Sequence, residues 1–78
     1  MTDQTILDYI YRIAGHSYPS LEIAREDVNT TVQGAILAYT YKQIRDAVLA
    51  NQFTQARLHA ILVDADVQRQ RLLQALKI

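Results

Sequence analysis

The 78-residue chain has no cysteine, only one proline and only two glycines. Without cysteine no disulfide can brace a domain of this size, and two isolated glycines cannot form a glycine-rich phosphate-binding loop. No apolar run approaches the length of a membrane span, and the N-terminal segment lacks the basic and continuously apolar parts of a signal peptide. We therefore expect no membrane insertion and take the cytoplasm as the default location.

Hydrophobic residues, in contrast, make up 50% of the chain, which is far too many for a disordered protein. A chain of this length forms one domain, residues 1–78, and buries only a modest share of its surface. So much apolar surface in a small domain without disulfides favours burial against a second copy or a partner. A monomeric three-helix bundle is the alternative.

The spacing of the apolar residues predicts an all-α fold, made of a short N-terminal helix and a long antiparallel helical hairpin. We expect the first helix to run from about Thr5 to Ala14, with Thr2 or Asp3 as its N-cap and Gly15 as the residue that ends it. Apolar residues take up most of its circumference, so this helix should be covered on more than one side.

The second helix, which should begin near Pro19 and end near Ala50, allows two interpretations. One is a single long helix, straight or bent. The other is a break near Asn29, because Thr30 and Gln33 have the spacing of a capping box. Since no glycine or proline lies at that point, the sequence favours the continuous helix.

Two apolar stripes run along this second segment on nearly opposite sides. The first should hold the short helix or serve as an outer binding stripe, and the second should face the third helix. The first comprises Leu21, Val28, Val32, Ala35 and Tyr39, and the second Leu37, Tyr41, Ile44, Ala47 and Val48.

The hairpin turn is the most clearly encoded feature of the sequence. Asn51 tolerates the left-handed conformation that ends many helices, and Thr54 is placed to cap the next helix. Phe53 and Leu58 have the spacing of a hydrophobic staple. The chain must therefore fold back on itself here.

The third helix should run from Gln55 to about Leu76. Its hairpin-facing positions follow each other at heptad spacing, Leu58, Leu62, Ala65, Arg69, Leu72 and Leu76. Across the hairpin this spacing places the large Tyr41 opposite the small Ala65, a complementary pair of the kind that dense packing needs.

No group of residues predicts catalysis or a metal site. His16 and Ser17 are adjacent, but no third group is placed to orient the histidine as a base. His59, Asp64 and Asp66 lie at offsets that do not share one face of a helix, so they cannot converge on a metal ion. We expect a protein that is not an enzyme and that holds no cofactor.

Charge is unevenly distributed along this neutral chain. Residues 1–39 have five acidic and two basic side chains, a net charge of −3, and residues 40–78 have six basic and three acidic ones, a net charge of +3. This asymmetry either orients a contact with a partner or only complements the dipole of the last helix. Arg69 and Arg71 are few for a nucleic-acid site, so a nucleic-acid-binding regulator is the secondary hypothesis.

Candidate partner-binding residues come from three sources. Tyrosine combines a large apolar area with a hydroxyl that tolerates water, and all five tyrosines lie within residues 9–41. The outer stripe of the second helix offers apolar side chains, and Arg69 either extends past its apolar neighbours to water or fixes the register of an interface. The candidates are Tyr9, Tyr11, Leu21, Val28, Val32, Tyr39 and Arg69.

The sequence thus predicts a small, non-catalytic helical interaction module of the chaperone, adaptor or inhibitor type. It would bind a partner helix or a second copy through an apolar groove or through the outer stripe. The layout resembles that of small bacterial secretion chaperones and of hairpins that dimerise into four-helix bundles. This resemblance concerns architecture alone and implies no role for any residue.

Overall fold

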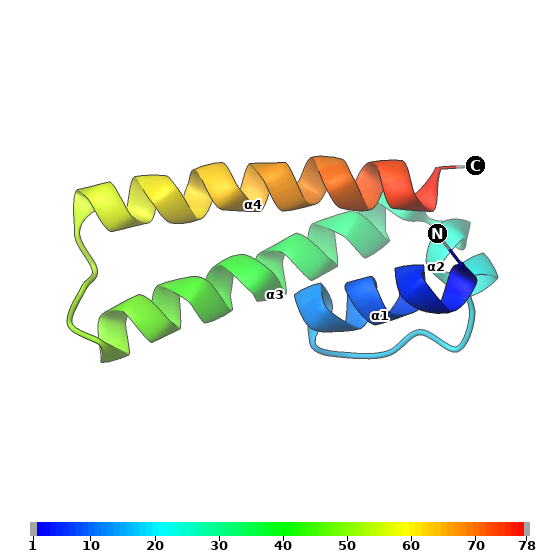
Figure 1. The fold of residues 1–78 in the computed structure, drawn as a ribbon, viewed down its shortest axis with the longest axis horizontal. Helices are drawn as coiled ribbons and strands as arrows, with labels where there is room; N and C mark the ends of the chain where they lie inside the picture. Colours follow the sequence, from blue (N-terminus) through cyan, green and yellow to red (C-terminus); the bar gives the residue numbers. More distant parts are fainter. Residues whose placement is uncertain (1, 78) are drawn as a thin grey trace.

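The computed structural model describes residues 2–77, in which four helices and no strand are present. The helices are α1 (Asp3–Ala14), α2 (Leu21–Glu26), α3 (Val28–Leu49) and α4 (Gln55–Leu76). The two long helices form an antiparallel hairpin, and α1 lies beside only the half of the hairpin where α3 begins and α4 ends (Figure 1). The predicted all-α fold, with a short helix followed by a long hairpin, is confirmed.

The first helix begins slightly earlier than predicted and ends where predicted. Thr2 is its N-cap, and its hydroxyl accepts a hydrogen bond from the backbone N–H of Thr5 at 3.2 Å. Gly15 ends the helix with φ at +80°, a conformation that costs glycine little because it has no Cβ. The cap and the terminating glycine therefore fix both ends of α1 from local sequence alone.

The second predicted helix is broken, so the continuous helix that the sequence favours is wrong. The break lies at Asp27, two residues before Asn29, where the backbone leaves the helical region. The Asp27 carboxylate caps α3 by accepting from both the backbone N–H and the hydroxyl of Thr30, and these bonds lower the pKa of Asp27. The buried Thr31 hydroxyl donates to the Ala24 carbonyl at 2.7 Å, which satisfies an acceptor at the broken end.

The hairpin turn forms as predicted. Asn51 has φ at +56°, and the N–H groups of Asn51 and Gln52 donate to the carbonyls of Val48 and Ala47, which is the Schellman pattern. Thr54 caps α4 by accepting from the backbone N–H of Arg57 at 3.1 Å. Helix α4 then has the predicted bounds.

The buried core occupies only one half of the molecule. Its members come from all four helices, and all of them lie before residue 40 or after residue 63 in the sequence: Ile6, Ile10, Ile13, Leu21, Ala24, Val32, Ala35, Ile36, Ala65, Leu72 and Leu76. We call residues 2–39 and 64–77 the body, and residues 40–63, the free end of the hairpin, the arm. Ala47 and Ile61 are the buried hydrophobic residues of the arm.

The predicted pairing of the two hairpin helices is wrong at Tyr41. Tyr41 does not pack on Ala65, because the Tyr41 side chain is 70% exposed while Ala65 is buried in the body. Helix α4 packs on the side of α3 that carries Val32, Ile36 and Ala47, and Tyr41 lies five residues from Ile36, well around the helix from that side. The second apolar stripe therefore faces solvent along most of its length.

Candidate functional site

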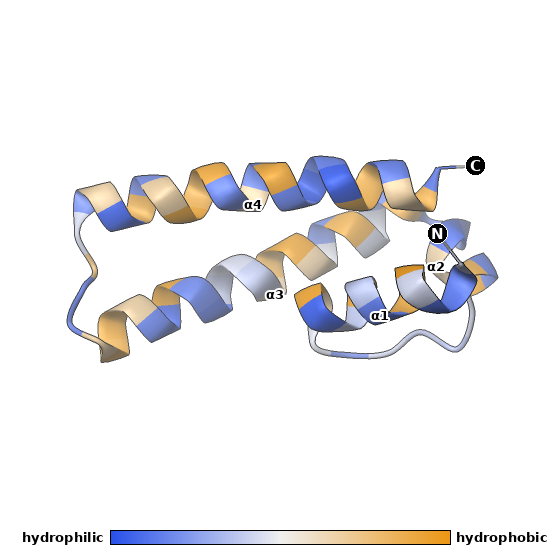
Figure 2. Cartoon of the chain, viewed as in Figure 1, coloured by the Kyte–Doolittle hydropathy of each residue, from blue (hydrophilic) through white to orange (hydrophobic). Residues whose placement is uncertain are grey.

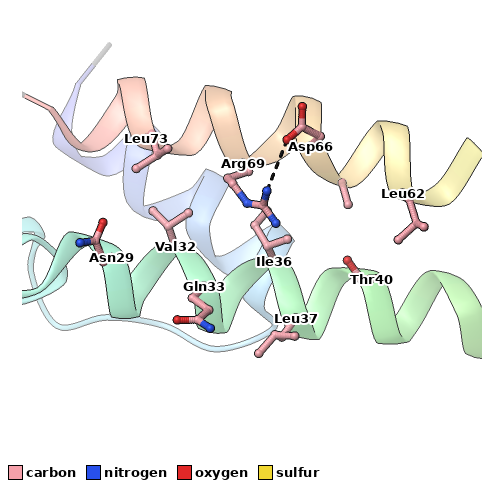
Figure 3. A pocket seen from close by; sticks show the side chains of 11 residues that line it. Asn29, Val32, Gln33, Ile36, Leu37, Thr40, Leu62, Asp66, Arg69 and Leu73 are labelled. Carbon is pink, nitrogen blue, oxygen red and sulfur yellow. Dashed lines mark hydrogen bonds and ion pairs between the residues drawn. The ribbon is translucent and has the colours of Figure 1, made fainter.

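An open groove runs between α3 and α4 on the side of the hairpin away from α1, and its volume is about 700 Å³. Val32, Ile36 and Ala65 are buried at its floor. Figure 3 shows this groove with α1 behind the hairpin. The residues that line it are Asn29, Val32, Gln33, Ile36, Leu37, Thr40, Leu62, Ala65, Asp66, Arg69 and Leu73. We call this set the hairpin groove.

The walls of the hairpin groove combine exposed leucines with one ion pair. Leu37 on α3 is 64% exposed and Leu62 on α4 is 51% exposed, so each presents apolar surface to solvent. Arg69 reaches from α4 toward α3 above Ile36, and its guanidinium lies 3.3 Å from the Asp66 carboxylate (Figure 3). An exposed pair of this kind adds little stability, about 0–1 kcal/mol, but it places a polar group at the rim of an apolar surface.

The apolar surface continues from the groove along the arm. Leu37 is followed by Tyr41, Ile44 and Val48 at intervals of four, three and four residues, which keeps all four on one side of α3. Tyr41 and Val48 are exposed, and Ile44 is half-buried. We call these four residues the apolar row. Figure 2 shows hydrophobic residues at the free end of α3, where no third helix covers the hairpin.

A hydrogen-bonded polar cluster lies where the body meets the arm. The Tyr9 hydroxyl of α1 donates to Gln68 Oε1 at 2.6 Å, and Gln68 Nε2 donates to Asp64 Oδ1 at 3.3 Å. The Tyr39 hydroxyl of α3 donates to the other oxygen of the same Asp64 carboxylate. The cluster therefore ties α1, α3 and α4 together at one level of the bundle.

These contacts change the acidity of both tyrosines. The hydrogen bond to the Asp64 carboxylate, with burial second, raises the pKa of Tyr39 to about 12. Burial raises the pKa of Tyr9, and the charges of Arg71 and Arg12 oppose that rise. Both phenols are consequently protonated donors at neutral pH. As protonated donors, both phenols hold the hydrogen bonds that join the three helices at this level.

The structure distributes the seven candidate partner-binding residues over different environments. Leu21 and Val32 are each 4% exposed and belong to the core, so they are not available to a partner while the fold is closed. Val28 packs half-buried against the core. Tyr11 is 54% exposed on α1, beside a small hollow formed with Gln4 and Tyr18.

The other candidates lie closer to the hairpin groove. Arg69 is at its rim, and Val32, although buried, forms part of its floor. Tyr9 and Tyr39 are half-buried, and their hydroxyls are committed to the polar cluster. The outer stripe of the sequence interpretation is thus mainly the inner, core-facing side of α2 and α3.

Sequence reasoning missed the exposed walls of the groove, Leu37 and Leu62. It assigned Leu37 and Leu62 to the contact between the two hairpin helices, where they would be hidden from solvent. The signal that identifies them is length: α1 has 12 residues and α3 and α4 have 22 each, so α1 can cover only part of the hairpin.

Comparisons of the chain with protein-family models, with curated proteins and with solved structures find no match. Within residues 2–77, no helix has the length and apolarity needed to cross a bilayer, and no three histidine or acidic side chains gather as they would around a metal ion. Any interpretation of function therefore starts from the geometry of the groove and the row.

Proposed function

We propose that the chain is a small, non-catalytic protein-binding module, and that the hairpin groove together with the apolar row is its binding surface. The observation that supports this proposal is the position of the exposed hydrophobic side chains. Leu37, Leu62, Tyr41 and Val48 are exposed to water along one side of the hairpin, although the same molecule buries eleven hydrophobic residues in one core. Contiguous exposed apolar surface of this kind marks interaction sites in small proteins.

The surface has the features of a helix-binding site. Its floor is apolar, its walls are leucines from two helices, and polar groups stand at its rim. Interfaces commonly combine an apolar centre with a polar rim, and aromatic residues such as Tyr41 are enriched there. A groove between two helices that lie side by side accepts the apolar side of a further helix by ridge-into-groove packing.

The same geometry disfavours a nucleic-acid site on α4. Arg69 and Arg71 are two residues apart, so they point to nearly opposite sides of the helix. Arg69 pairs with Asp66 at the groove, whereas Arg71 acts on the Tyr9 phenol on the side of α1. The two arginines do not form a common phosphate-binding patch, and protein binding remains the proposal.

Site-specific photo-crosslinking in cells that make the protein tests the proposed surface. A photoreactive residue at Leu62 should give covalent adducts, with a second copy or with another protein. The matched control is the same residue at Ala60, which is also exposed and is two positions away, on the opposite side of α4. Adducts from Leu62 should disappear when Tyr41→Asp places a charge on the apolar row.

Equal adduct yields at Leu62 and Ala60, or no adduct at either position, would contradict the proposed function. So would adducts from Leu62 that persist in the Tyr41→Asp variant. Circular dichroism of each variant should show unchanged helix content, because all three side chains are exposed and none belongs to the core.

A further inference from the structure

A single residue, Asp27, separates α2 from α3. Its backbone, at φ −139° and ψ 86°, leaves the helical region, while the residues on both sides of it are helical. No glycine or proline lies within residues 20–33, and the apolar spacing continues across the break. No strong helix breaker therefore opposes one continuous helix over residues 21–49.

The break depends on a small number of hydrogen bonds. The Asp27 carboxylate caps α3 through Thr30, and both residues are exposed to water. The Arg25 side chain donates from Nε to the Leu76 carbonyl at 2.9 Å, which fastens α2 to the end of α4. An exposed cap of this kind changes the balance between a broken and a continuous helix by a factor of only about five.

Helices α1 and α2 pack on the hairpin as one unit. They contact each other as well as α3 and α4, at the end of the molecule where α3 begins (Figure 1). We call residues 2–26 the α1–α2 unit. If the break straightened, this unit would leave its apolar site on the hairpin, and the same unit of a second copy would fit that site with the same contacts. The core residues that the unit contributes are Ile6, Ile10, Ile13, Leu21 and Ala24.

We infer that two copies of this chain exchange their α1–α2 units. In the exchanged dimer, residues 21–49 of each copy form one continuous helix, and each α1–α2 unit packs on the hairpin of the other copy. The core contacts are those of the closed molecule, so the two states differ mainly at Asp27. The hairpin groove lies on the side away from α1 and stays open, so this inference does not rest on the proposed function.

Sedimentation equilibrium of the full chain, refolded at high protein concentration, tests the exchange. Asp27→Ala removes the cap and favours a continuous helix. It should shift the equilibrium toward the dimer at least about tenfold, because each dimer contains two breaks. The matched control is Asp46→Ala, which removes an exposed aspartate of α3 that caps no helix and should change nothing. Equal dimer stability for the two variants, or no dimer from either, would overturn the proposal.

Val28, the first residue of α3, offers the reverse test. Proline suits the first position of a helix and keeps the preceding residue extended, so Val28→Pro is compatible with the break. Within a continuous helix the same proline would clash with the carbonyl four residues before it. Val28→Pro should therefore abolish the dimer, whereas Val28→Ala, which shortens the same half-buried side chain, should retain it. Equal dimerisation of the two variants would overturn the proposal.

Photo-crosslinking between two differently labelled copies identifies the exchanged contact. In the closed molecule the Tyr9 hydroxyl of α1 lies 2.6 Å from the Gln68 amide oxygen of α4. A chain with a photoreactive phenylalanine at Tyr9 is refolded together with the isotope-labelled native chain, and the dimer is isolated. Adducts should join the probe to the labelled chain near Gln68. Adducts confined to the chain that carries the probe would overturn the exchange.

The Tyr41→Asp variant separates this inference from the proposed function. Tyr41 lies outside the α1–α2 unit and its site, so the variant should form the exchanged dimer as the native chain does, while it loses the partner adducts from Leu62. A dimer that Tyr41→Asp abolishes would belong to the hairpin face and would overturn the exchange.

Discussion

The body and the arm consist of the same two long helices, yet they differ in what lies against those helices. In the body, α1 and α2 close over the hairpin, and eleven hydrophobic residues form one buried cluster. In the arm, α3 and α4 have only each other, and Ala47 and Ile61 are the buried hydrophobic residues. Two packed helices can hide only the sides that face each other, so the remaining apolar side chains of the arm stay in water.

Helix length accounts for this difference. The 12 residues of α1 span about 18 Å, and the 22 residues of α3 span about 33 Å. A helix of that length covers little more than half of the hairpin. The polar cluster of Tyr9, Tyr39, Asp64 and Gln68 lies at the limit of this cover and closes the core with satisfied hydrogen bonds.

The largest expected effect compares truncation of a leucine in each half. Leu72→Ala removes a fully buried side chain of the body and should lower the free energy of unfolding by about 2–5 kcal/mol. Leu49→Ala removes an arm side chain that is 77% exposed and should change it by less than about 0.5 kcal/mol. Urea denaturation at equal protein concentration measures both values.

A milder variant of the body allows the same comparison if Leu72→Ala does not fold. Ile10→Val shortens another fully buried side chain and should cost about 1 kcal/mol. Equal losses for Ile10→Val and Leu49→Ala would show that the arm is packed as tightly as the body.

A smaller effect is expected at the boundary of the two halves. Tyr39→Phe removes the hydroxyl that donates to the Asp64 carboxylate. It should lower the free energy of unfolding by about 1 kcal/mol at pH 8, less than a fully buried bond to a charged group would, because the site is only partly buried. The pKa of Tyr39 is about 12 in the folded protein and about 10 in an unfolded chain. Above pH 10 the unfolded chain therefore loses its proton first, and the stabilisation by Tyr39 declines as the pH rises toward 12.

Urea denaturation at pH 8 and pH 11 measures this dependence. The stability difference between the native protein and Tyr39→Phe should be smaller at pH 11 than at pH 8. Tyr41→Phe, in the exposed apolar row, is the control and should leave stability nearly unchanged at both values. A difference that grows with pH would refute the assigned hydrogen bond.

An effect of similar or smaller size is expected at the tip of the arm. Asn51→Gly should stabilise the turn by about 0.5 kcal/mol, because glycine adopts a φ of +56° more readily than asparagine. Asn51→Ala should destabilise it by about 1 kcal/mol for the opposite reason. Amide hydrogen exchange should show the changes in the arm, about twofold slower for Asn51→Gly, with the body unaffected.

Exchange rates that change equally in body and arm would show that the two halves open together. Unchanged exchange in both variants would show that the turn conformation contributes nothing to the arm.

The local features of the fold could be predicted from sequence because their causes lie within a few residues. Asn51 and Thr54 determine the turn through their own backbone and side-chain preferences, and Gly15 ends α1 in the same way. The break at Asp27 was harder, since several capping residues follow one another between Asp27 and Thr31 and the apolar spacing runs on across them. Only the hydrogen bonds of Asp27 and Thr31 distinguish the true cap.

The candidate site depended on long-range packing and was predicted less well. The two stripes of α3 have similar apolar character, so the sequence cannot indicate which one another helix covers. The structure buries Val32 and Ala35 and leaves Leu37 and Tyr41 exposed, a choice made by how α1 and α4 pack against α3. Of the predicted partner-binding residues, Arg69 remains available at the groove.

Helix α1 begins and α4 ends at the same end of the molecule, the end of the body (Figure 1). A tag, a fluorophore or a surface tether joined near either point would hold the protein by its closed half and leave the hairpin tip projecting into solution. Immobilised binding measurements can thus attach the chain from the N-terminal or the C-terminal side without obstructing the arm.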